Sequence, residues 1–127
     1  MSALSNHLET LLLAWHLTTG TAARPTAWYL AVGTGSSDTG LTGEPSGNGY
    51  ARQSITFTVT GDTASNSNAI TIGPCSGTNW GTMSHFAIFD AETGGNLLWH
   101  GALTAPKLVE VGESLTVAIG DIDLTLA

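Results

Sequence analysis

The stretch WGTMSHFAIFDAETGGNLLWHGAL, residues 80–103, is the most apolar part of the chain and is interrupted by one polar segment. Strands are predicted at Met83–Phe89 and Leu97–Leu103, because both segments are rich in apolar and aromatic residues. The intervening DAETGGN is dense in Asp, Gly and Asn, the residue types that form tight turns. The stretch therefore predicts an antiparallel hairpin at the centre of a β fold.

This predicted hairpin carries large apolar side chains on both of its faces. Strict alternation along the strands places Phe86, Ile88 and Leu98 on one face, and Phe89, Leu97 and Trp99 near the other. A sheet with one solvated face should instead alternate cleanly between apolar and polar residues. Two explanations are open: a middle strand covered on both sides, or a surface that is buried in an assembly.

Further strands are predicted on both sides of the hairpin. They are Thr26–Val32, Tyr50–Val59, Ala69–Ile72, Leu115–Ile119 and Ile122–Leu126. Gly120-Asp121 between the last two is a two-residue hairpin signal, whereas the Gly-, Ser- and Thr-rich residues 33–49 predict a long functional or interface loop. About seven short strands with regular turn signals predict one mainly β domain, an antiparallel β-sandwich or jelly-roll-like fold.

A helix is predicted at the start of the chain, over LSNHLETLLLAWHL, residues 4–17. Leu4, Leu8, Leu11, Leu12 and Trp15 recur at helical spacing and form one apolar stripe. Ser2 or Ser5 is suited to cap the first turn, and Gly20 to take a left-handed conformation after the last one. We expect an arm at residues 1–20 and a β-sandwich at residues 21–127, with the stripe docked on its own sheet or on a neighbouring subunit.

Composition narrows the classes of partner. Ten carboxylates face three cations, which gives a formal net charge of -7. Nucleic-acid binding depends on clustered Lys and Arg, so neither a nucleic acid nor an anionic membrane is an expected partner. No run approaches the ~20 apolar residues of a membrane span, and no signal peptide is recognisable. We therefore expect a protein made in the cytoplasm of its host cell.

The residues that commonly perform catalysis do not form a recognisable motif. Cys75 is the only cysteine, and His7 and His16 lie on opposite sides of the predicted helix. His85 and His100 could be cross-strand neighbours, but no third metal ligand is evident. GTGSSDTG, residues 33–40, follows a strand but lacks the helix and the Gly-Lys-Ser/Thr of a phosphate loop. We expect no enzyme, no metal site and no cofactor.

The segment GEPSGNGYARQSITFTV, residues 43–59, contains Arg52, one of the three cations, directly after a glycine-rich loop. The glycines allow tight turns, and Arg52 and Tyr50 begin the predicted strand. Both residue types are enriched at protein interfaces, which makes this strand face a candidate contact surface. An ordinary solvated strand face is the alternative.

Several segments together resemble a family of small structural proteins of tailed bacteriophages, often labelled tail-fibre-like. Similar small β proteins serve as capsid cement or decoration. The matching segments are ALSNHLETLLL, WYLAV, GEPSGNGYARQSITF, NWGTMSHFAIFDAETGGNLLWHGAL and ESLTVAIGDIDLTLA, in family order and over nearly the whole chain. GTGSSDTG departs from the family pattern, in which the loop begins with more apolar residues.

The resemblance implies a virion component without catalysis. Our leading hypothesis is a capsid cement or decoration protein on the phage head surface, a homotrimer or homodimer that binds the major capsid protein. The expected interface residues are Leu8, Leu11, Leu12, Trp15, Tyr50, Arg52 and Trp99. The alternative is a tail-fibre or tail-tip module for host attachment, in which Trp28, Trp80 or Trp99 would stack on the sugar rings of a receptor glycan.

Overall fold

The computed structural model describes residues 2–20 and 22–126. Its largest sheet has five strands in the order β1-β10-β9-β2-β5, with every neighbouring pair antiparallel. The elements are β1 (Ser2–Leu4), α1 (Asn6–Leu17), β2 (Tyr29–Gly33), β3 (Gly35–Ser37), β4 (Gly40–Thr42), β5 (Gln53–Ser54), β6 (Phe57–Thr60), β7 (Thr63–Asn66), β8 (Ile70–Ile72), β9 (Gly81–Phe89), β10 (Leu97–Val109), β11 (Leu115–Val117) and β12 (Asp123–Thr125).

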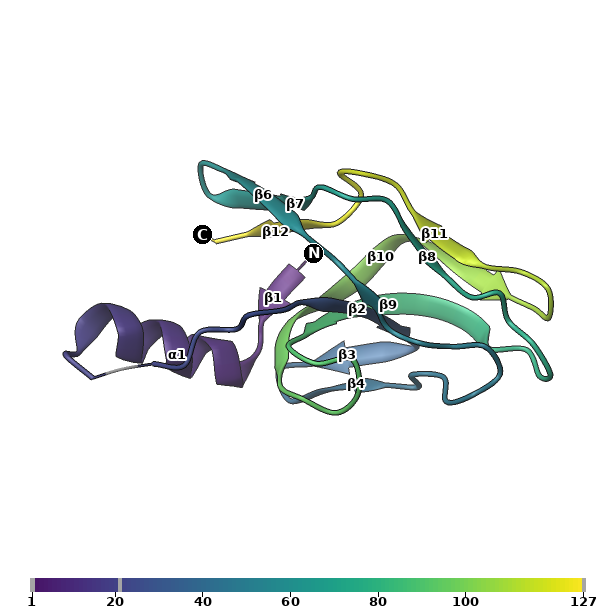
Figure 1. Ribbon diagram of the computed structural model, residues 1–127, viewed down its shortest axis with the longest axis horizontal. Helices are drawn as coiled ribbons and strands as arrows, with labels where there is room; N and C mark the ends of the chain where they lie inside the picture. The colour runs from purple at the N-terminus through teal and green to yellow at the C-terminus, as the bar shows by residue number, and fades with distance from the viewer. Residues whose placement is uncertain (1, 21, 127) are drawn as a thin grey trace.

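A second layer covers one face of the five-stranded sheet. It consists of the pair β11-β8 and the three-stranded sheet β12-β7-β6, which lie over β10, β9 and β2 (Figure 1). The main core fills the space between the layers and includes Leu30, Ile72, Met83, Ile88 and Leu124. The predicted fold class is confirmed: the protein is mainly β, built from antiparallel sheets, with an N-terminal helix.

The predicted central hairpin is also confirmed, as β9 and β10. Its turn is closed by Asp90, whose carboxylate accepts the main-chain N–H of Asn96 at 2.7 Å and its side-chain amide at 3.0 Å. Gly94 and Gly95 take positive φ values of 62° and 75° in this turn. Asp and Gly therefore have the turn-forming roles that the sequence indicates.

A β-bulge in β10 changes which side chains share a face. Leu97 pairs with Phe89, but Trp99 pairs with Ile88, so Leu98 is an extra residue on β10. Trp99 consequently packs against the main core, on the side opposite to Leu97. The prediction that Trp99 shares a face with Leu97 and Phe89 is wrong, because strict alternation does not account for the extra residue.

The other face of the central hairpin is covered within the chain. Phe89 and Leu97 are 8% and 7% exposed and form a second cluster with Ala31 and Ala87. Leu41 of β4 packs against this cluster, so the β3-β4 hairpin covers the sheet from below (Figure 1). For these residues the first explanation is correct, a middle strand covered on both sides.

Two strand predictions need correction. Residues 33–49 are not a structureless loop, because β3 and β4 pair within them. The predicted strand at residues 50–59 is divided: β5 pairs with β2 in the large sheet, whereas β6 pairs with the unpredicted strand β7 in the second layer. Ile55, 1% exposed, lies at the division, where the chain crosses between the layers through the core.

The last predicted hairpin is also wrong. Gly120-Asp121 does form a turn, in which Asp121 donates its N–H to Ala118 O at 3.1 Å. However, β11 pairs with β8 and β12 pairs with β7, so the two strands joined by this turn belong to different sheets. The strand β8 itself is as predicted.

The helix starts later than predicted. Leu4 lies in β1, which pairs with β10, and the side chain of Ser5 accepts the N–H of Leu8 as the N-cap. Of the two predicted caps, the structure therefore has Ser5. The helix ends at Leu17; its C-cap Thr18 is extended, and Gly20 does not adopt the predicted left-handed conformation. The division of the chain at residue 21 lies outside the described residues, but residues 2–4 of the predicted arm belong to the main sheet.

Candidate interaction surface

Hydrogen bonds fix the first residues of α1 to the β domain. Ser5 is 1% exposed; it donates its main-chain N–H to Leu98 O at 2.9 Å and its hydroxyl to Leu97 O. Asn6 donates its N–H to Asp38 O at 3.0 Å. These carbonyls belong to the bulge in β10 and to the β3-β4 turn, so two elements set the direction in which the helix leaves the sheet.

A buried histidine holds the β3-β4 turn in place at this point. His100, 9% exposed, has Nε2 at 2.9 Å from Asp38 Oδ1 and Nδ1 at 2.9 Å from Ser36 Oγ. His100 pairs with Ala87, and His85 with Ala102, so the two histidines are not directly opposite each other across the hairpin. The bond network of His100 with β3 was not recognised in the sequence, because residues 36 and 38 lie in a segment predicted to be a loop.

Ser36, His100 and Asp38 are the residue types of a hydrolase triad. The pattern of exposure of their side chains, however, is the reverse of that in a triad. In a triad the carboxylate is buried and orients the histidine toward an accessible serine. Here the Asp38 side chain is 53% exposed and the His100 side chain 11%. The trio therefore acts as a structural link between β3 and β10.

Beyond its first turn, α1 projects from the β domain. None of its residues is buried, and Leu8 is the residue that packs against the main core. Leu11 and Leu12 are half-buried, and residues 22–28 run back along the helix to β2 (Figure 1). Trp15, the last residue of the predicted stripe, is 69% exposed. The stripe thus meets its own sheet only at its beginning.

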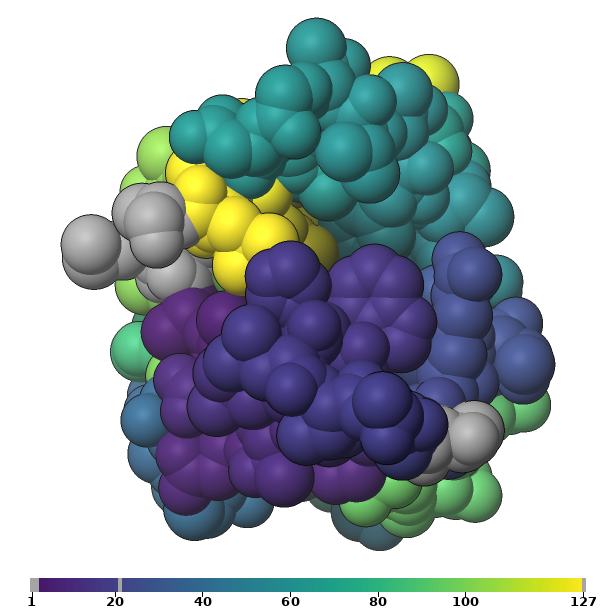
Figure 2. All heavy atoms as spheres, turned by 90° about the vertical axis from the view of Figure 1, so that its left-hand side faces the viewer, coloured from purple at the N-terminus to yellow at the C-terminus, as the bar shows by residue number. Residues whose placement is uncertain are grey.

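A second group of apolar side chains lies on another side of the helix. Leu13 and Leu17 are four residues apart and share a face, which lies about 140° to 180° around the helix from Leu8. They are 60% and 69% exposed. We call Leu13, Trp15 and Leu17 the apolar tip. Figure 2 shows α1 in purple and dark blue, projecting toward the viewer below β12 and the β6-β7 hairpin. The sequence prediction of a single stripe missed Leu13 and Leu17.

The predicted interface residue Arg52 is engaged inside the domain. Its guanidinium donates to both carboxylate oxygens of Glu44, from Nε to Oε2 at 2.8 Å and from Nη2 to Oε1 at 2.9 Å. Nη1 donates to the carbonyls of Ala91 at 3.1 Å and Gly94 at 2.7 Å. The guanidinium also lies 3.7 Å from the centroid of the Phe89 ring. Arg52 thereby joins the glycine-rich loop to the turn of the central hairpin.

Tyr50 completes this network. Its hydroxyl donates to Glu44 Oε2 at 2.6 Å and accepts the N–H of Val32 at 3.3 Å. Burial raises the pKa of Tyr50, and the adjacent Glu44 carboxylate raises it further. Burial also raises the pKa of Glu44, but hydrogen bonds from Arg52 and Tyr50 and the charge of Arg52 outweigh it, so the pKa lies below 4.5. An interface role for Tyr50 and Arg52 stays a prediction.

Glycines in this loop allow a close approach to the neighbouring chain. Gly49 has a φ of 81°, and a Cβ atom on it would lie 2.2 Å from Pro74 O. Beside it, Trp80 donates from Nε1 to Asn48 O at 2.9 Å and meets the Tyr50 ring edge-on, with centroids 5.4 Å apart. Trp28, Trp80 and Trp99 are half-buried and pack against the main core. These contacts give all three tryptophans a role in packing.

Within the described residues there is neither a cluster of metal-ligating side chains nor a membrane-spanning helix. In residues 2–20 and 22–126, no group of three or more His, Cys, Asp or Glu side chains could hold a metal ion. No helix in the same ranges is long and apolar enough to cross a bilayer. The described residues instead form a two-layer β domain and a helical arm that carries the exposed apolar tip.

The comparison with protein families identifies the class of protein to which the chain belongs. A family model described as "Podophage GP4 fiber I protein gp80" matches residues 3–125. The chain therefore belongs to this family of phage structural proteins, which are related to tail fibres. No curated protein matches the chain.

Proposed function

We propose that the protein is a non-enzymatic component of a phage fibre and is joined to a neighbouring virion protein through the apolar tip of α1. Membership of the fibre I family supports a place in the virion fibre. In this proposal the neighbour supplies an apolar groove that receives the helix, as in other helix-in-groove complexes. The β domain remains outside the groove as a compact module.

The observation that carries the proposal is the exposure of Leu13, Trp15 and Leu17, at 60%, 69% and 69%. Apolar side chains that are exposed next to one another commonly mark a site of protein interaction. The β domain contacts only the first turns of α1, so it leaves the tip uncovered. The hydrogen bonds of Ser5 and Asn6 hold the helix in this position before a partner arrives, which reduces the ordering cost of binding.

A complementation experiment tests this role. Phage lacking the gene is grown with the double variant Leu13→Asp/Leu17→Asp, or with the matched control Thr10→Asp/His16→Asp, which changes exposed polar positions of the same helix. We expect both proteins to fold, as judged by circular dichroism, and only the control to be present in purified particles at wild-type copy number. Normal incorporation of the Leu13→Asp/Leu17→Asp variant would contradict the proposal.

A capsid decoration protein is the second candidate. It is favoured by the compact shape of the described β domain, since residues 22–126 contain no extended shaft. In that role the tip would bind the outer face of the major capsid protein. Homodimers or homotrimers would present several tips and bind more tightly through avidity.

The two candidates differ in where the protein lies on the particle and in how many copies are present. Cryo-electron microscopy of purified particles, with quantitative mass spectrometry of their proteins, distinguishes them. Hundreds of copies distributed over the head would identify a decoration protein and contradict the fibre role. A small copy number confined to the tail would support the fibre role.

A further inference from the structure

A cavity of about 810 Å³ opens between β10 and the second layer, and neither Glu44 nor Arg52 lines it. Ala102 of β10 pairs with His85 and Lys107 with Met83, so the four residues between them on β10 lie opposite Ser84 alone. Pro106, within this bulge, lacks the N–H needed to continue the ladder. The bulge therefore moves the edge of β10 away from its regular path.

The second layer is divided at the same place. β11 pairs only with β8, and β12 with β7, so no ladder joins β11 to β12 across the turn at Gly120. Residues of both strands line the cavity together with the β10 bulge. Its volume falls within the range of about 300–1,000 Å³ that is typical of small-molecule sites.

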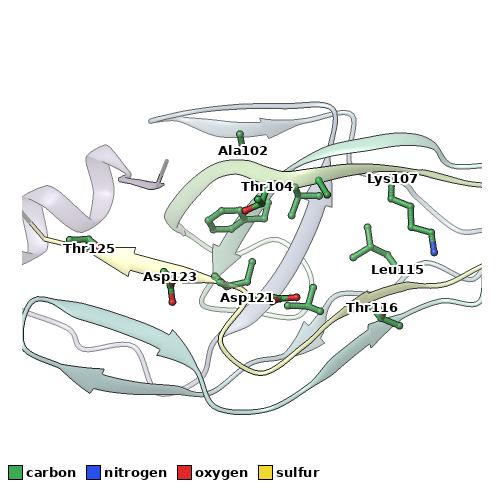
Figure 3. Close-up of a pocket in the computed structure, with 13 residues that line it drawn as sticks. Ala102, Thr104, Lys107, Leu115, Thr116, Asp121, Asp123 and Thr125 are labelled. Carbon is green, nitrogen blue, oxygen red and sulfur yellow. The ribbon is translucent and has the colours of Figure 1, made fainter.

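The lining combines an apolar floor with a polar rim. The floor is formed by core residues and one half-buried residue of the bulge, namely Phe86, Leu115, Val117, Ile122 and Leu103. The rim carries hydroxyl, carboxylate and ammonium groups, namely those of Thr104, Thr116, Thr125, Asp121, Asp123 and Lys107. In Figure 3, Lys107 extends from β10 toward β11, and Leu115 extends from β11 toward β10.

Hydrogen bonds within the protein leave acceptor capacity at this rim. Asp121 uses Oδ2 to accept the N–H of Ala118 at 3.0 Å, and Asp123 uses Oδ1 to accept the hydroxyl of Ser65. Each carboxylate has a second oxygen, and both residues are exposed. Lys107 donates from Nζ to Ser114 O at 2.5 Å. Because the ammonium is bonded to the protein and the rim also carries two carboxylates, the rim favours hydrogen-bond donors and disfavours anions.

We infer that this cavity binds a neutral saccharide. A pyranose ring has an apolar C–H face for the floor and a border of hydroxyl groups that donate to carboxylates and exchange hydrogen bonds with threonines. Charge-assisted hydrogen bonds to Asp121 and Asp123 orient such a ligand. A phosphate or a sulfated sugar would meet the carboxylates and the net charge of -7. As a ligand site on a fibre component, the cavity rests on the proposed function, but its chemistry can be tested without particles.

This site differs from the tryptophans that the sequence suggested for glycan stacking. Trp28, Trp80 and Trp99 are half-buried against the core and do not line the cavity. The cavity arises from a bulge in β10 and from a split between two sheets, neither of which is visible in the sequence pattern.

The test is a titration of the isotope-labelled full chain, followed by heteronuclear NMR. The probes are a panel of neutral oligosaccharides that includes maltotriose, cellotriose and chitotriose, with inorganic phosphate and hexa-arginine as charged probes. We expect a neutral sugar to shift the amide signals of Thr104, Thr116 and Asp121 in a saturable way. Shifts at these residues with phosphate or hexa-arginine alone, or with none of the probes, would overturn the inference.

Substitutions test whether the sugar binds in this cavity. Ala105→Trp places a bulky ring at the exposed rim and should abolish the shifts, whereas Ala69→Trp, at an exposed position that does not line the cavity, should leave them unchanged. Asp121→Asn should weaken binding about tenfold, because a charged acceptor becomes neutral. Equal binding by all three variants would overturn the assignment to this cavity. Ala105→Trp should still be incorporated into particles and Leu13→Asp/Leu17→Asp should still bind sugar, so the two proposals can fail separately.

Discussion

The guanidinium of Arg52 and the carboxylate of Glu44 form a bidentate pair, with N–O distances of 2.8 and 2.9 Å. The pair is well shielded, because the two side chains are 9% and 22% exposed. Arg52 also donates to two carbonyls of the β9-β10 turn. One side chain therefore connects the glycine-rich loop to the central turn, whose carbonyls lie 39 and 42 residues further along the chain than Arg52.

Replacing Arg52 with lysine should lower the free energy of unfolding by about 3 kcal/mol. Lysine keeps the charge but cannot donate in parallel to both oxygens of Glu44 and also reach the turn carbonyls. Urea denaturation of the purified protein measures the change. Arg24→Lys, at an exposed position, is the matched control and should change stability by less than about 0.5 kcal/mol. Equal effects of the two substitutions would show that the bidentate geometry is unimportant.

The same pair predicts a dependence of stability on acidic pH. Because the pKa of Glu44 is lowered by folding from a usual value of 4.5, its contribution is fully present above that value and is lost as the pH falls through the lower folded pKa. Glu44→Gln should be less stable than the wild type at neutral pH, and the two unfolding curves should converge in acid. Urea titrations at a series of pH values provide the comparison. Parallel curves would argue against this role.

Substitutions at Gly49 and Gly47 distinguish the cost of a steric conflict from the cost of backbone strain. Both have positive φ, 81° and 70°, but a Cβ on Gly49 would lie 2.2 Å from Pro74 O, whereas a Cβ on Gly47 would meet nothing within 4 Å. Gly47→Ala should cost about 1 kcal/mol for the left-handed conformation alone. Gly49→Ala should cost clearly more, because the chain at Pro74 must also move. Thermal unfolding followed by circular dichroism compares the two, and similar midpoints would exclude the close approach.

Alanine substitutions of leucines on α1 should differ in their effect on stability, according to the contacts of each leucine. Leu8 packs against the main core, so Leu8→Ala should destabilise the domain by about 2 kcal/mol. Leu13→Ala removes a side chain that is 60% exposed and should change stability by less than about 0.5 kcal/mol. Chemical denaturation of both variants tests this difference. A large loss with Leu13→Ala would mean that the tip is covered in the isolated protein.

The elements that follow from local pattern were predictable. The β9-β10 hairpin has long apolar strands around a turn rich in Asp and Gly, and α1 has a serine cap before a periodic apolar run. β7 was not predictable in the same way, because its sequence TASN is polar and its pairing with β6 and β12 depends on the tertiary fold. The division of residues 50–59 follows from a crossing between layers, which a continuous alternation conceals.

The candidate surfaces could also be predicted only in part, because they too depend on the tertiary fold. The helical stripe was visible, but the sequence did not show that only Leu8 reaches the core, since that depends on the angle at which Ser5 starts the helix. A single extra residue at Leu98 moved Trp99 to the other face of the sheet. Arg52 and Tyr50 were recognisable as unusual, but their partner Glu44 lies eight residues before Arg52, in a loop whose path the glycines determine.

The firm attachment of α1 has a mechanical consequence. A helix of 12 residues is about 18 Å long, and its first turn is held by Ser5, Asn6 and the His100–Asp38 link. A protein that binds the C-terminal end of α1 is therefore held at a fixed distance from the sheet and in a fixed orientation. If α1 binds a virion protein as proposed, every copy would hold its β domain in the same orientation relative to that protein.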